Sequence, residues 1–304
     1  MLPKPDWLRV RYAKTPELEA VEKLLDSLKL NTVCKEANCP NCLECFSRKT
    51  ATILIMGTNC TRNCRFCNVR NGEPQALDPD EPGNAAGAVR ELGLKYVVIT
   101  SVTRDDLPDG GAGHFAQTIR EIRKAAPGTV IEVLIPDFMG RPDALQTVVD
   151  AFPDVISHNM ETVESLYPAV RPQAQYQRSL DLLKNVKLLN PDIRSKSGLM
   201  AGLGETKEQV YELLNDLREA GCEFLTIGQY LAPSKQHIPV HEYIEPSVFD
   251  EYGAKAREMG FDFVASAPFV RSSYHAGEAW NMDIITEGGN NESFLDAEGK
   301  AIHI

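Results

Sequence analysis

The sequence lacks the features that would place the protein at a membrane or on nucleic acid. No apolar run approaches the roughly 18–20 residues of a membrane-spanning helix, and residues 1–14 lack the apolar core of a signal peptide. The 304 residues carry 43 acidic side chains against 32 basic ones, a net charge of −11, whereas general affinity for nucleic acid needs clustered Lys and Arg. We therefore expect a cytoplasmic protein with no membrane and no nucleic-acid partner.

Disulfides are not expected either, although the chain has eight cysteines. The cytoplasm keeps thiols reduced. Seven of the eight lie between Cys34 and Cys67, and only Cys222 stands apart. Disulfide frameworks are spread along the domain that they staple, whereas closely spaced thiols in a reducing compartment indicate metal. We expect Cys222, between a predicted helix and a predicted strand, to be a buried structural thiol.

Strand-like and helix-like segments alternate from residue 52 onward. The predicted strands are Thr52–Gly57, Tyr96–Val102, Val130–Pro136, Val155–His158, Arg194–Met200, Phe224–Leu231 and Phe263–Ala267. The predicted helices between them are Pro82–Leu92, His114–Ala125, Pro142–Ala151, Tyr176–Leu189, Lys207–Ala220 and Pro246–Met259. This alternation predicts βαβ units on a parallel sheet, which right-handed crossovers curl into a full or partial barrel. An open doubly wound sheet is the alternative.

Polar side chains near the C-terminal ends of the predicted strands favour the barrel. Examples are Thr100 and Ser101 on one strand, Asn159 after another, and Lys196 on a third. In an α/β barrel these ends converge on one mouth, where active sites form. The sequence therefore predicts one shared pocket at the mouth.

The run Cys60-Thr-Arg-Asn-Cys64-Arg-Phe-Cys67 directly follows the first predicted barrel strand and has the spacing C-x3-C-x2-C. Three thiolates in one loop can bind three irons of a [4Fe–4S] cluster and leave the fourth iron without a protein ligand. That open iron can chelate S-adenosylmethionine (SAM), whose reductive cleavage yields a 5′-deoxyadenosyl radical. With Phe66 before the last cysteine, the run resembles the radical SAM superfamily.

Zinc is the alternative ligand of these cysteines. Cys39 with Cys42 and Cys64 with Cys67 form two C-x2-C pairs separated by 21 residues, which is near the spacing of a zinc ribbon. That interpretation leaves three of the seven clustered cysteines without a role.

A second set of three cysteines precedes the first. Cys34-Lys-Glu-Ala-Asn-Cys39-Pro-Asn-Cys-Leu-Glu-Cys45 contains C-x4-C-x5-C, which indicates a second cluster. The two spacings together, with the run Glu-Ala-Asn-Cys-Pro-Asn, resemble the lipoyl synthase family. Further runs extend the resemblance over residues 5–276: Thr100-Ser-Val-Thr-Arg-Asp-Asp-Leu-Pro-Asp-Gly-Gly-Ala, His158-Asn-Met-Glu-Thr-Val, Lys196-Ser-Gly-Leu-Met-Ala-Gly-Leu-Gly-Glu-Thr, Thr226-Ile-Gly-Gln-Tyr-Leu-Ala-Pro-Ser and Arg271-Ser-Ser-Tyr-His-Ala.

The resemblance implies a first cluster that binds SAM and is held by Cys60, Cys64 and Cys67, which makes these cysteines catalytic. Side chains of the mouth and of the cysteine loop would contact SAM: Phe66, Thr100, Ser101, Asn159, Glu161 and Lys196. The alternative for the polar ones is that they form hydrogen bonds at the barrel mouth and bind no ligand.

The resemblance also implies an auxiliary [4Fe–4S] cluster, held by Cys34, Cys39 and Cys45 with Ser273 of the R-S-S-Y run as its fourth ligand. An alkoxide suits an iron–sulfur site less well than a thiolate, so Ser273 should leave more easily on protonation. Its departure would let cluster sulfide attack a substrate radical, which makes Ser273 catalytic. Cys42 lies inside the run and could replace Cys39 or Cys45; we treat it as a spare thiol.

The implied activity is radical insertion of two sulfur atoms at C6 and C8 of a protein-bound octanoyl chain. The implied fold is a partial (β/α)6-type TIM barrel at residues 51–268, with extensions at residues 1–50 and 269–304. Expected partners are octanoylated lipoyl carrier domains (E2 subunits of 2-oxoacid dehydrogenases, glycine-cleavage H protein), an electron donor such as ferredoxin or flavodoxin, and an iron–sulfur carrier. The alternatives are another radical SAM sulfur-insertion enzyme, such as a methylthiotransferase or a biotin synthase-like protein, or a non-catalytic zinc- or cluster-binding regulator.

Overall fold

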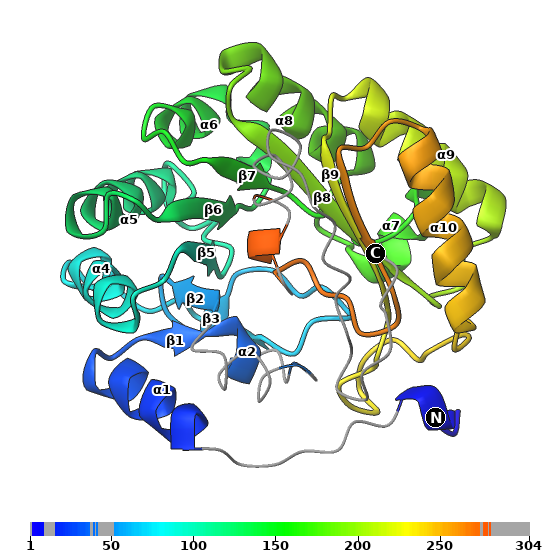
Figure 1. Cartoon of the computed structure of the whole chain (residues 1–304), viewed down its shortest axis with the longest axis horizontal. Coiled ribbons are helices and arrows are strands. Elements are labelled where there is room, and N and C mark those ends of the chain that lie inside the picture. The colour runs from blue at the N-terminus through cyan, green and yellow to red at the C-terminus, as the bar shows by residue number, and fades with distance from the viewer. Residues whose placement is uncertain are drawn as a thin grey trace, which may run out of the picture.

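Seven parallel strands and one antiparallel edge strand form the main sheet in the part of the chain that the structure describes (Figure 1). The computed structural model describes residues 2–8, 16–36, 39, 41, 52–273, 276–278 and 280. In sheet order the strands are β1 (Asn31–Thr32), β2 (Thr52–Ile55), β5 (Tyr96–Ser101), β6 (Val130–Leu134), β7 (Val155–Ser157), β8 (Arg194–Ala201), β9 (Phe224–Gln229) and β10 (Phe263–Ser266). A separate small sheet pairs β3 (Asn59–Cys60) with β4 (Arg70–Asn71).

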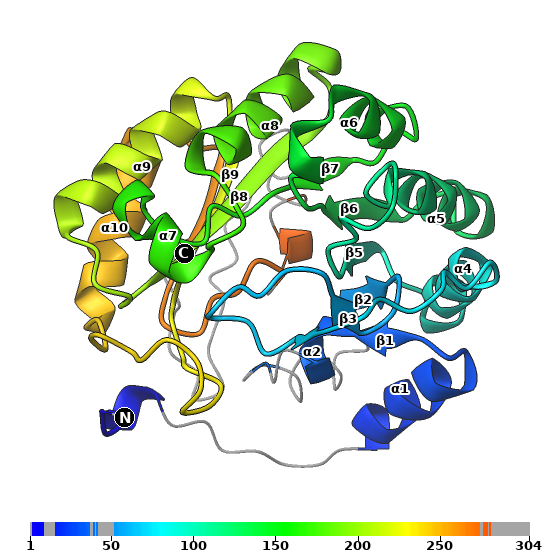
Figure 2. The same ribbon diagram turned by 180° about the vertical axis from the view of Figure 1, so that it is seen from behind.

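A long helix follows each of the first six parallel strands, and together these helices form an arc outside the curved sheet (Figures 1 and 2). They are α4 (Glu81–Leu92), α5 (Ala112–Ala125), α6 (Pro142–Val149), α8 (Tyr176–Leu189), α9 (Lys207–Glu219) and α10 (Pro246–Glu258). The other helical elements are η1 (Asp6–Leu8), α1 (Pro16–Ser27), α2 (Val33–Glu36), η2 (Phe138–Gly140), η3 (Glu164–Leu166) and α7 (Tyr167–Val170). Among the described residues, no helix is long and apolar enough to cross a membrane.

The arrangement confirms the predicted partial barrel of six β/α units. Each predicted strand and helix is present, with ends that differ by a few residues. Within the described residues β1 and β10 are the two edges of the sheet and do not pair, so the barrel does not close. Helices on the outer face only, rather than on both faces, distinguish it from the doubly wound alternative.

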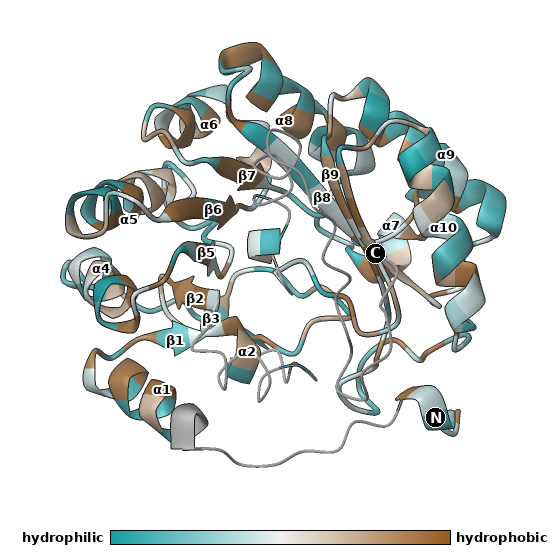
Figure 3. Cartoon of the chain, in the orientation of Figure 1, coloured by the Kyte–Doolittle hydropathy of each residue, from teal (hydrophilic) through white to brown (hydrophobic). Residues whose placement is uncertain are grey.

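Buried apolar strands explain why the sheet lies inside the arc of helices. Strands β6 and β7 are among the most apolar segments in Figure 3, as expected for parallel strands covered on both faces. Local signals then set the ends of helices. Helix α9 begins at a capping box in which the Thr206 side chain accepts a hydrogen bond from the Gln209 N–H and the Gln209 side chain accepts one from the Thr206 N–H.

The segment after β10, orange in Figures 1 and 2, crosses the space inside the curved sheet. It passes so close to β9 that a Cβ on Gly228 would lie 2.0 Å from the carbonyl oxygen of Val270. The side-chain amide of Asn41 donates a 2.8 Å hydrogen bond to the carbonyl of Phe269. Residues of the two predicted extensions therefore meet inside the curve of the sheet.

Candidate active site

One loop at the C-terminal end of β2 carries three of the predicted ligands, Cys60, Cys64 and Cys67. Met56 and Gly57 turn the chain into this loop with φ values of 68° and 89°, and a Cβ on Gly57 would collide with the side chain of Gln75. Strands β3 and β4 then pair, and the Gly72 N–H donates a 3.2 Å hydrogen bond to the Cys60 carbonyl. The loop therefore closes on itself at the mouth of the partial barrel.

Loops that follow other strands hold this cysteine loop in place. After β5, the Thr103 N–H donates to the Cys60 sulfur over 3.3 Å. After β9, the His237 ring nitrogen Nε2 lies 3.1 Å from the Cys67 carbonyl oxygen. The position of the thiols is thus set by at least three separate strand ends of the sheet.

Burial and neighbouring charges disfavour the thiolate form of Cys64 and Cys67 in the protein alone. Burial raises the pKa of the Cys64 thiol; Arg171 opposes the rise, and Glu161 and Cys60 add to it. Burial also raises the pKa of Cys67 to about 12, with the charges of Cys64 and Cys60 adding to it. A thiol must lose its proton to bind iron, and none of the described cysteines is in a disulfide. Three thiols in one loop fit a positively charged multi-iron group.

The described residues contain no preformed site for a single metal ion. There, no group of three or more His, Cys, Asp or Glu side chains is placed to hold one ion.

Two of the predicted SAM contacts, Asn159 and Glu161, lie together after β7. Glu161 has a left-handed backbone with φ of 67°, and its N–H donates a 3.0 Å hydrogen bond to the Gly198 carbonyl. The Asn159 amide donates to Glu161 Oε1 over 3.0 Å, and its Oδ1 accepts a 3.1 Å hydrogen bond from the Ser272 hydroxyl. Burial raises the pKa of the Glu161 carboxyl. Because this carboxyl also acts on the Cys64 thiol, the structure brings both residues to the cysteine loop.

Two other predicted SAM contacts near the mouth, Thr100 and Ser101, differ in whether their hydroxyls already form a hydrogen bond. The Thr100 hydroxyl donates a 3.0 Å hydrogen bond to the Leu134 carbonyl on the neighbouring strand. The Ser101 hydroxyl is buried and has no hydrogen-bond partner. A buried hydroxyl left in this state costs about 1–3 kcal/mol, so Ser101 would gain from a polar ligand. Phe66 packs against the apolar cluster that includes Tyr230.

Lys196 lies apart from these residues. Its Nζ is 3.0 and 2.9 Å from the two carboxylate oxygens of Glu132, and the Tyr96 hydroxyl donates a 2.5 Å hydrogen bond to Glu132 Oε2. The side chains of Lys196 and Glu132 are 1% and 0% exposed. Lys196 is the third residue of the eight-residue strand β8, so it lies near the start of the strand rather than at the mouth. The pairing with Glu132 accounts for its burial without a ligand.

Two members of the N-terminal cysteine set, Cys34 and Cys39, lie within the described residues, and Cys39 lies near Arg271 of the C-terminal segment. Cys34 is buried in α2, and the Cys39 N–H donates a 3.0 Å hydrogen bond to the Cys34 carbonyl. Burial raises the pKa of the Cys39 thiol, while the nearby cation of Arg271 lowers it. Cys45 and the alternative ligand Cys42 lie outside the described residues.

Ser273 lies beside the start of β2. Its hydroxyl oxygen accepts a 2.8 Å hydrogen bond from the Thr52 hydroxyl. Thr52 begins the four-residue strand that leads into the mouth loop. At about 3.3 Å per residue, β2 separates Ser273 from that loop by roughly 13 Å.

Two buried arginines at the mouth were not singled out from the sequence. Arg62, inside the cysteine run, contacts Asp105 and Asp137. Arg171 donates from Nη1 to the Asn159 carbonyl over 2.8 Å. The position of Arg62 between two cysteines was the one signal in the sequence that could have identified it as a site residue. The carboxylates that pair with it follow other strands, so the spacing of the cysteines does not reveal them.

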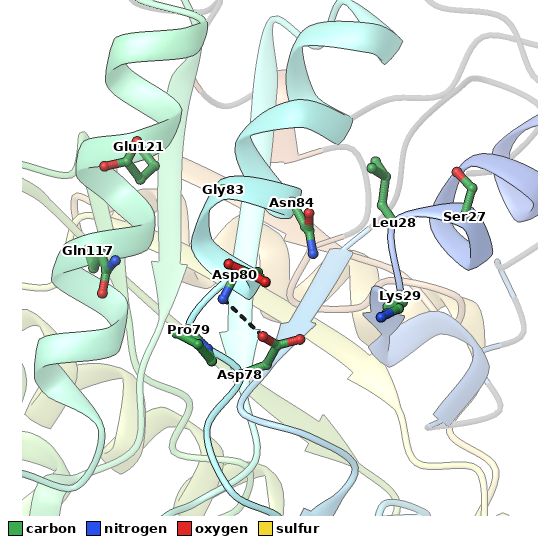
Figure 4. Close-up of a pocket in the computed structure, with 10 residues that line it drawn as sticks. All are labelled: Ser27, Leu28, Lys29, Asp78, Pro79, Asp80, Gly83, Asn84, Gln117 and Glu121. Carbon is green, nitrogen blue, oxygen red and sulfur yellow. Dashed lines mark hydrogen bonds between the residues drawn. The ribbon is translucent and has the colours of Figure 1, made fainter.

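A groove of about 520 Å³ lies elsewhere, on the outside of the barrel between α1, α4 and α5 (Figure 4). Asp78, Asp80 and Glu121 are among its lining residues, and the Asp80 N–H donates a 2.9 Å hydrogen bond to Asp78 Oδ1. None of the predicted site residues lines it, and we assign it no function.

The partial barrel with three cysteines after its first parallel strand defines the class of protein. The sequence model of the Radical SAM superfamily matches residues 54–217. Methylornithine synthase has a similar structure, with a TM-score of 0.51 at 12% identity over 86% of this chain and 81% of that one. A maturase of the [FeFe]-hydrogenase gives 0.56 at 14% identity over 83% and 68% of the two chains. At these identities the structural likeness shows the fold alone.

Relatives in sequence narrow the class to one family. Lipoyl synthase of Alkaliphilus metalliredigens is 58% identical over 276 residues, 91% of this chain and 95% of that protein. Lipoyl synthase of Caldicellulosiruptor saccharolyticus is 60% identical over 275 residues, 90% and 96% of the two chains. The chain belongs to the lipoyl synthase family of the radical SAM superfamily.

Family membership confirms the predicted activity and cofactors. The protein is a sulfur-inserting radical transferase that acts on octanoylated carrier proteins, and it uses SAM and two [4Fe–4S] clusters. The zinc protein and the other sulfur-inserting enzymes are thereby set aside.

Proposed function

We propose that the three cysteines of the mouth loop hold the cluster at which SAM binds, and that Cys34, Cys39 and Cys45 hold the auxiliary cluster with Ser273. The observation that carries this assignment is the contact of Ser273 with the first residue of β2, because that strand leads directly into the mouth loop. When bound, the first cluster with SAM supplies the radical that removes hydrogen at C6 and C8, and the second supplies the sulfur.

Residues around the mouth loop bind and orient SAM in this proposal. Ser101 offers a buried hydroxyl without a partner, and Glu161 offers a carboxylate for the amino group or ribose hydroxyls. Asn159 holds that carboxylate and is itself held by the Ser272 hydroxyl. Phe66 and Thr100 would line the same pocket. Lys196 is not included, because its ammonium is already paired with a buried carboxylate.

The partners and location follow the same proposal. The octanoyl chain is presented by lipoyl domains of 2-oxoacid dehydrogenase E2 subunits or by the glycine-cleavage H protein. Ferredoxin or flavodoxin supplies electrons, and an iron–sulfur carrier rebuilds the auxiliary cluster, all in the cytoplasm. The preferred carrier and electron donor can be measured in parallel assays of sulfur insertion. Each assay uses an octanoylated E2 lipoyl domain or octanoylated H protein, with ferredoxin or flavodoxin as reductant.

Iron analysis under anaerobic conditions tests the ligand assignment. Replacing either cysteine triplet with Ala should remove about four irons and leave the other cluster in place. Cys42→Ala should leave both clusters intact. Loss of the auxiliary cluster in this variant would make Cys42 a ligand in place of Cys39 or Cys45.

Ser273 is tested with its neighbour as the matched control. Ser273→Ala should still cleave SAM to 5′-deoxyadenosine, but mass spectrometry of an octanoyl-lysine peptide should show little or no added sulfur. Ser272→Ala should keep sulfur insertion but weaken SAM binding, because Ser272 contacts Asn159 instead. Wild-type iron content and sulfur insertion in Ser273→Ala would remove this serine from the ligand set.

A further inference from the structure

The side chain of Arg62 ties the cysteine loop to two neighbouring strand ends. Its Nε lies 2.6 Å from Asp105 Oδ2, and its Nη2 lies 2.9 Å from Asp105 Oδ1 and 2.6 Å from Asp137 Oδ1. The first carboxylate follows β5 and the second follows β6. The side chains of Arg62 and Asp137 are 4% and 0% exposed, so solvent hardly screens their attraction. The planar guanidinium suits two carboxylates in a way that a lysine ammonium cannot.

The charges of this cluster balance without a ligand. Arg178 of α8 donates a 3.3 Å hydrogen bond to Asp137 Oδ2, and the Met139 N–H donates a 3.0 Å hydrogen bond to Asp137 Oδ1. Two arginines thus face two aspartates. Because both carboxylates are already engaged by protein donors, the cluster serves to fix the loop rather than to bind SAM.

Contacts beside Arg62 also join the cysteine loop to the loop after β5, and two N–H groups there donate to the Cys60 sulfur. Thr61 donates from its N–H and hydroxyl to the Thr103 carbonyl over 3.1 and 3.0 Å, and the Asp105 N–H donates to the Thr61 hydroxyl oxygen over 3.2 Å. With the two segments joined in this way, the Arg62 and Thr103 N–H groups donate to Cys60 Sγ over 3.4 and 3.3 Å. Hydrogen bonds to ligand sulfurs are one of the factors that set the reduction potential of an iron–sulfur cluster.

We propose that Arg62 is a positioning residue, which holds the Cys60–Cys64 segment against Asp105 and Asp137 and keeps two N–H groups on the Cys60 sulfur. The loop is thereby shaped for its cluster before iron binds, and the potential of the bound cluster is raised. The proposal rests on the proposed function only in taking Cys60 as an iron ligand.

The test uses the full chain with Cys34, Cys39 and Cys45 replaced by Ala, so that one cluster remains. In this background Arg62→Gln should lose iron to a chelator about tenfold faster, because three charge-assisted hydrogen bonds to two carboxylates are removed. An EPR-monitored redox titration should show a more negative midpoint potential. Arg62→Lys keeps the charge but loses the two-carboxylate geometry, and should fall between Gln and Arg in both measurements.

Arg194→Gln is the matched control. Arg194 also bridges two carboxylates, lying 2.8 Å from Glu223 Oε1 and 3.0 Å from Asp262 Oδ2, but at the opposite end of the strands. It should leave iron release and midpoint potential unchanged. If Arg62→Gln does not fold, Asp105→Asn removes one partner whose side chain is 26% exposed, and should shift both measurements in the same direction. Wild-type values in Arg62→Gln, or in Asp105→Asn where Arg62→Gln does not fold, would overturn the proposal.

A further variant separates this inference from the ligand assignment. Replacing Cys60, Cys64 and Cys67 with Ala in the same background should abolish iron binding. Retention of about four irons would overturn the proposed ligands themselves. Loss of iron there, with Arg62→Gln behaving as wild type, would overturn only the role of Arg62.

Discussion

The hydroxyl of Thr52 donates a 2.8 Å hydrogen bond to the hydroxyl oxygen of Ser273, which lies 221 residues further along the chain. Thr52 is 6% exposed and begins the strand that leads to the cysteine loop. A donor to the serine oxygen stabilises negative charge on that oxygen, which is the form that binds iron. The contact therefore fixes the position of Ser273 and, under the proposed ligand assignment, favours the form of its hydroxyl that would bind iron.

Thr52→Val should weaken the auxiliary cluster while leaving its cysteines in place. The substitution keeps the shape of the side chain and removes the donor, at a cost of about 1 kcal/mol to the serine contact. We expect iron of the auxiliary cluster to be released several-fold faster, and SAM cleavage to continue at the wild-type rate. Thr52→Ser, which keeps the hydroxyl, is the control. Equal iron release from the Val and Ser variants would show that the hydrogen bond has no part in ligation.

Lys196→Met should destabilise the fold more than it affects SAM. Removing one partner of a buried ion pair leaves an uncompensated charge on Glu132 and costs about 3–5 kcal/mol of the free energy of unfolding. The double variant Lys196→Met/Glu132→Gln should recover part of that loss, because no buried charge remains. Urea unfolding measures both. SAM affinity of the folded Lys196→Met protein should stay at the wild-type level, and its loss would restore the predicted contact of Lys196 with the cofactor.

The free energy of unfolding should fall between pH 7 and pH 5 because of His158. Its Nδ1 lies 2.8 Å from the Ile135 carbonyl oxygen and its Nε2 lies 2.9 Å from the Ser179 hydroxyl. Burial, with the nearby Arg171, lowers the pKa of His158 from 6.5 to about 4. Below pH 6.5 His158 is protonated in the unfolded chain but stays neutral in the folded chain. The stability present at pH 7 is therefore lost as the pH falls toward 4.

The expected loss from His158 is about 2 kcal/mol between pH 7 and pH 5. Urea unfolding of the cluster-free protein at the two pH values measures it, and His158→Gln should abolish most of the difference. Asp137, with its pKa lowered from 3.8 to about 2, titrates below this window and does not contribute. An equal pH dependence in His158→Gln would assign the effect to other groups.

Cys222 should react with iodoacetamide only when the protein unfolds. The side chain is 0% exposed, and burial raises the pKa of its thiol to about 12, so thiolate is scarce and inaccessible. Mass spectrometry after labelling at increasing urea concentration should show alkylation of Cys222 that follows the unfolding curve. Labelling in native buffer would contradict its position in the core. Cys222→Ala should leave the iron content unchanged.

The class of fold and the cysteine loop could both be predicted before the structure was known. Each strand and helix is a local pattern, because it depends on the spacing of its own apolar residues. The six β/α units were therefore predicted correctly, with small errors at the ends of the elements. The loop from Cys60 to Cys67 is likewise local, because its three thiols lie within eight residues. A chemistry contained in so short a segment can be recognised before the chain is folded.

The contacts of the other polar residues could not be predicted from the sequence and are seen in the folded structure. Lys196 was predicted at the mouth, but it is the third residue of β8 and its charge pairs with Glu132 from another strand. Arg62 meets carboxylates that follow two other strands, and Ser273 meets Thr52 across most of the chain. The partner of a polar side chain depends on burial and on how distant strands pack. The periodicity of one segment does not show which segments will lie beside it in the fold.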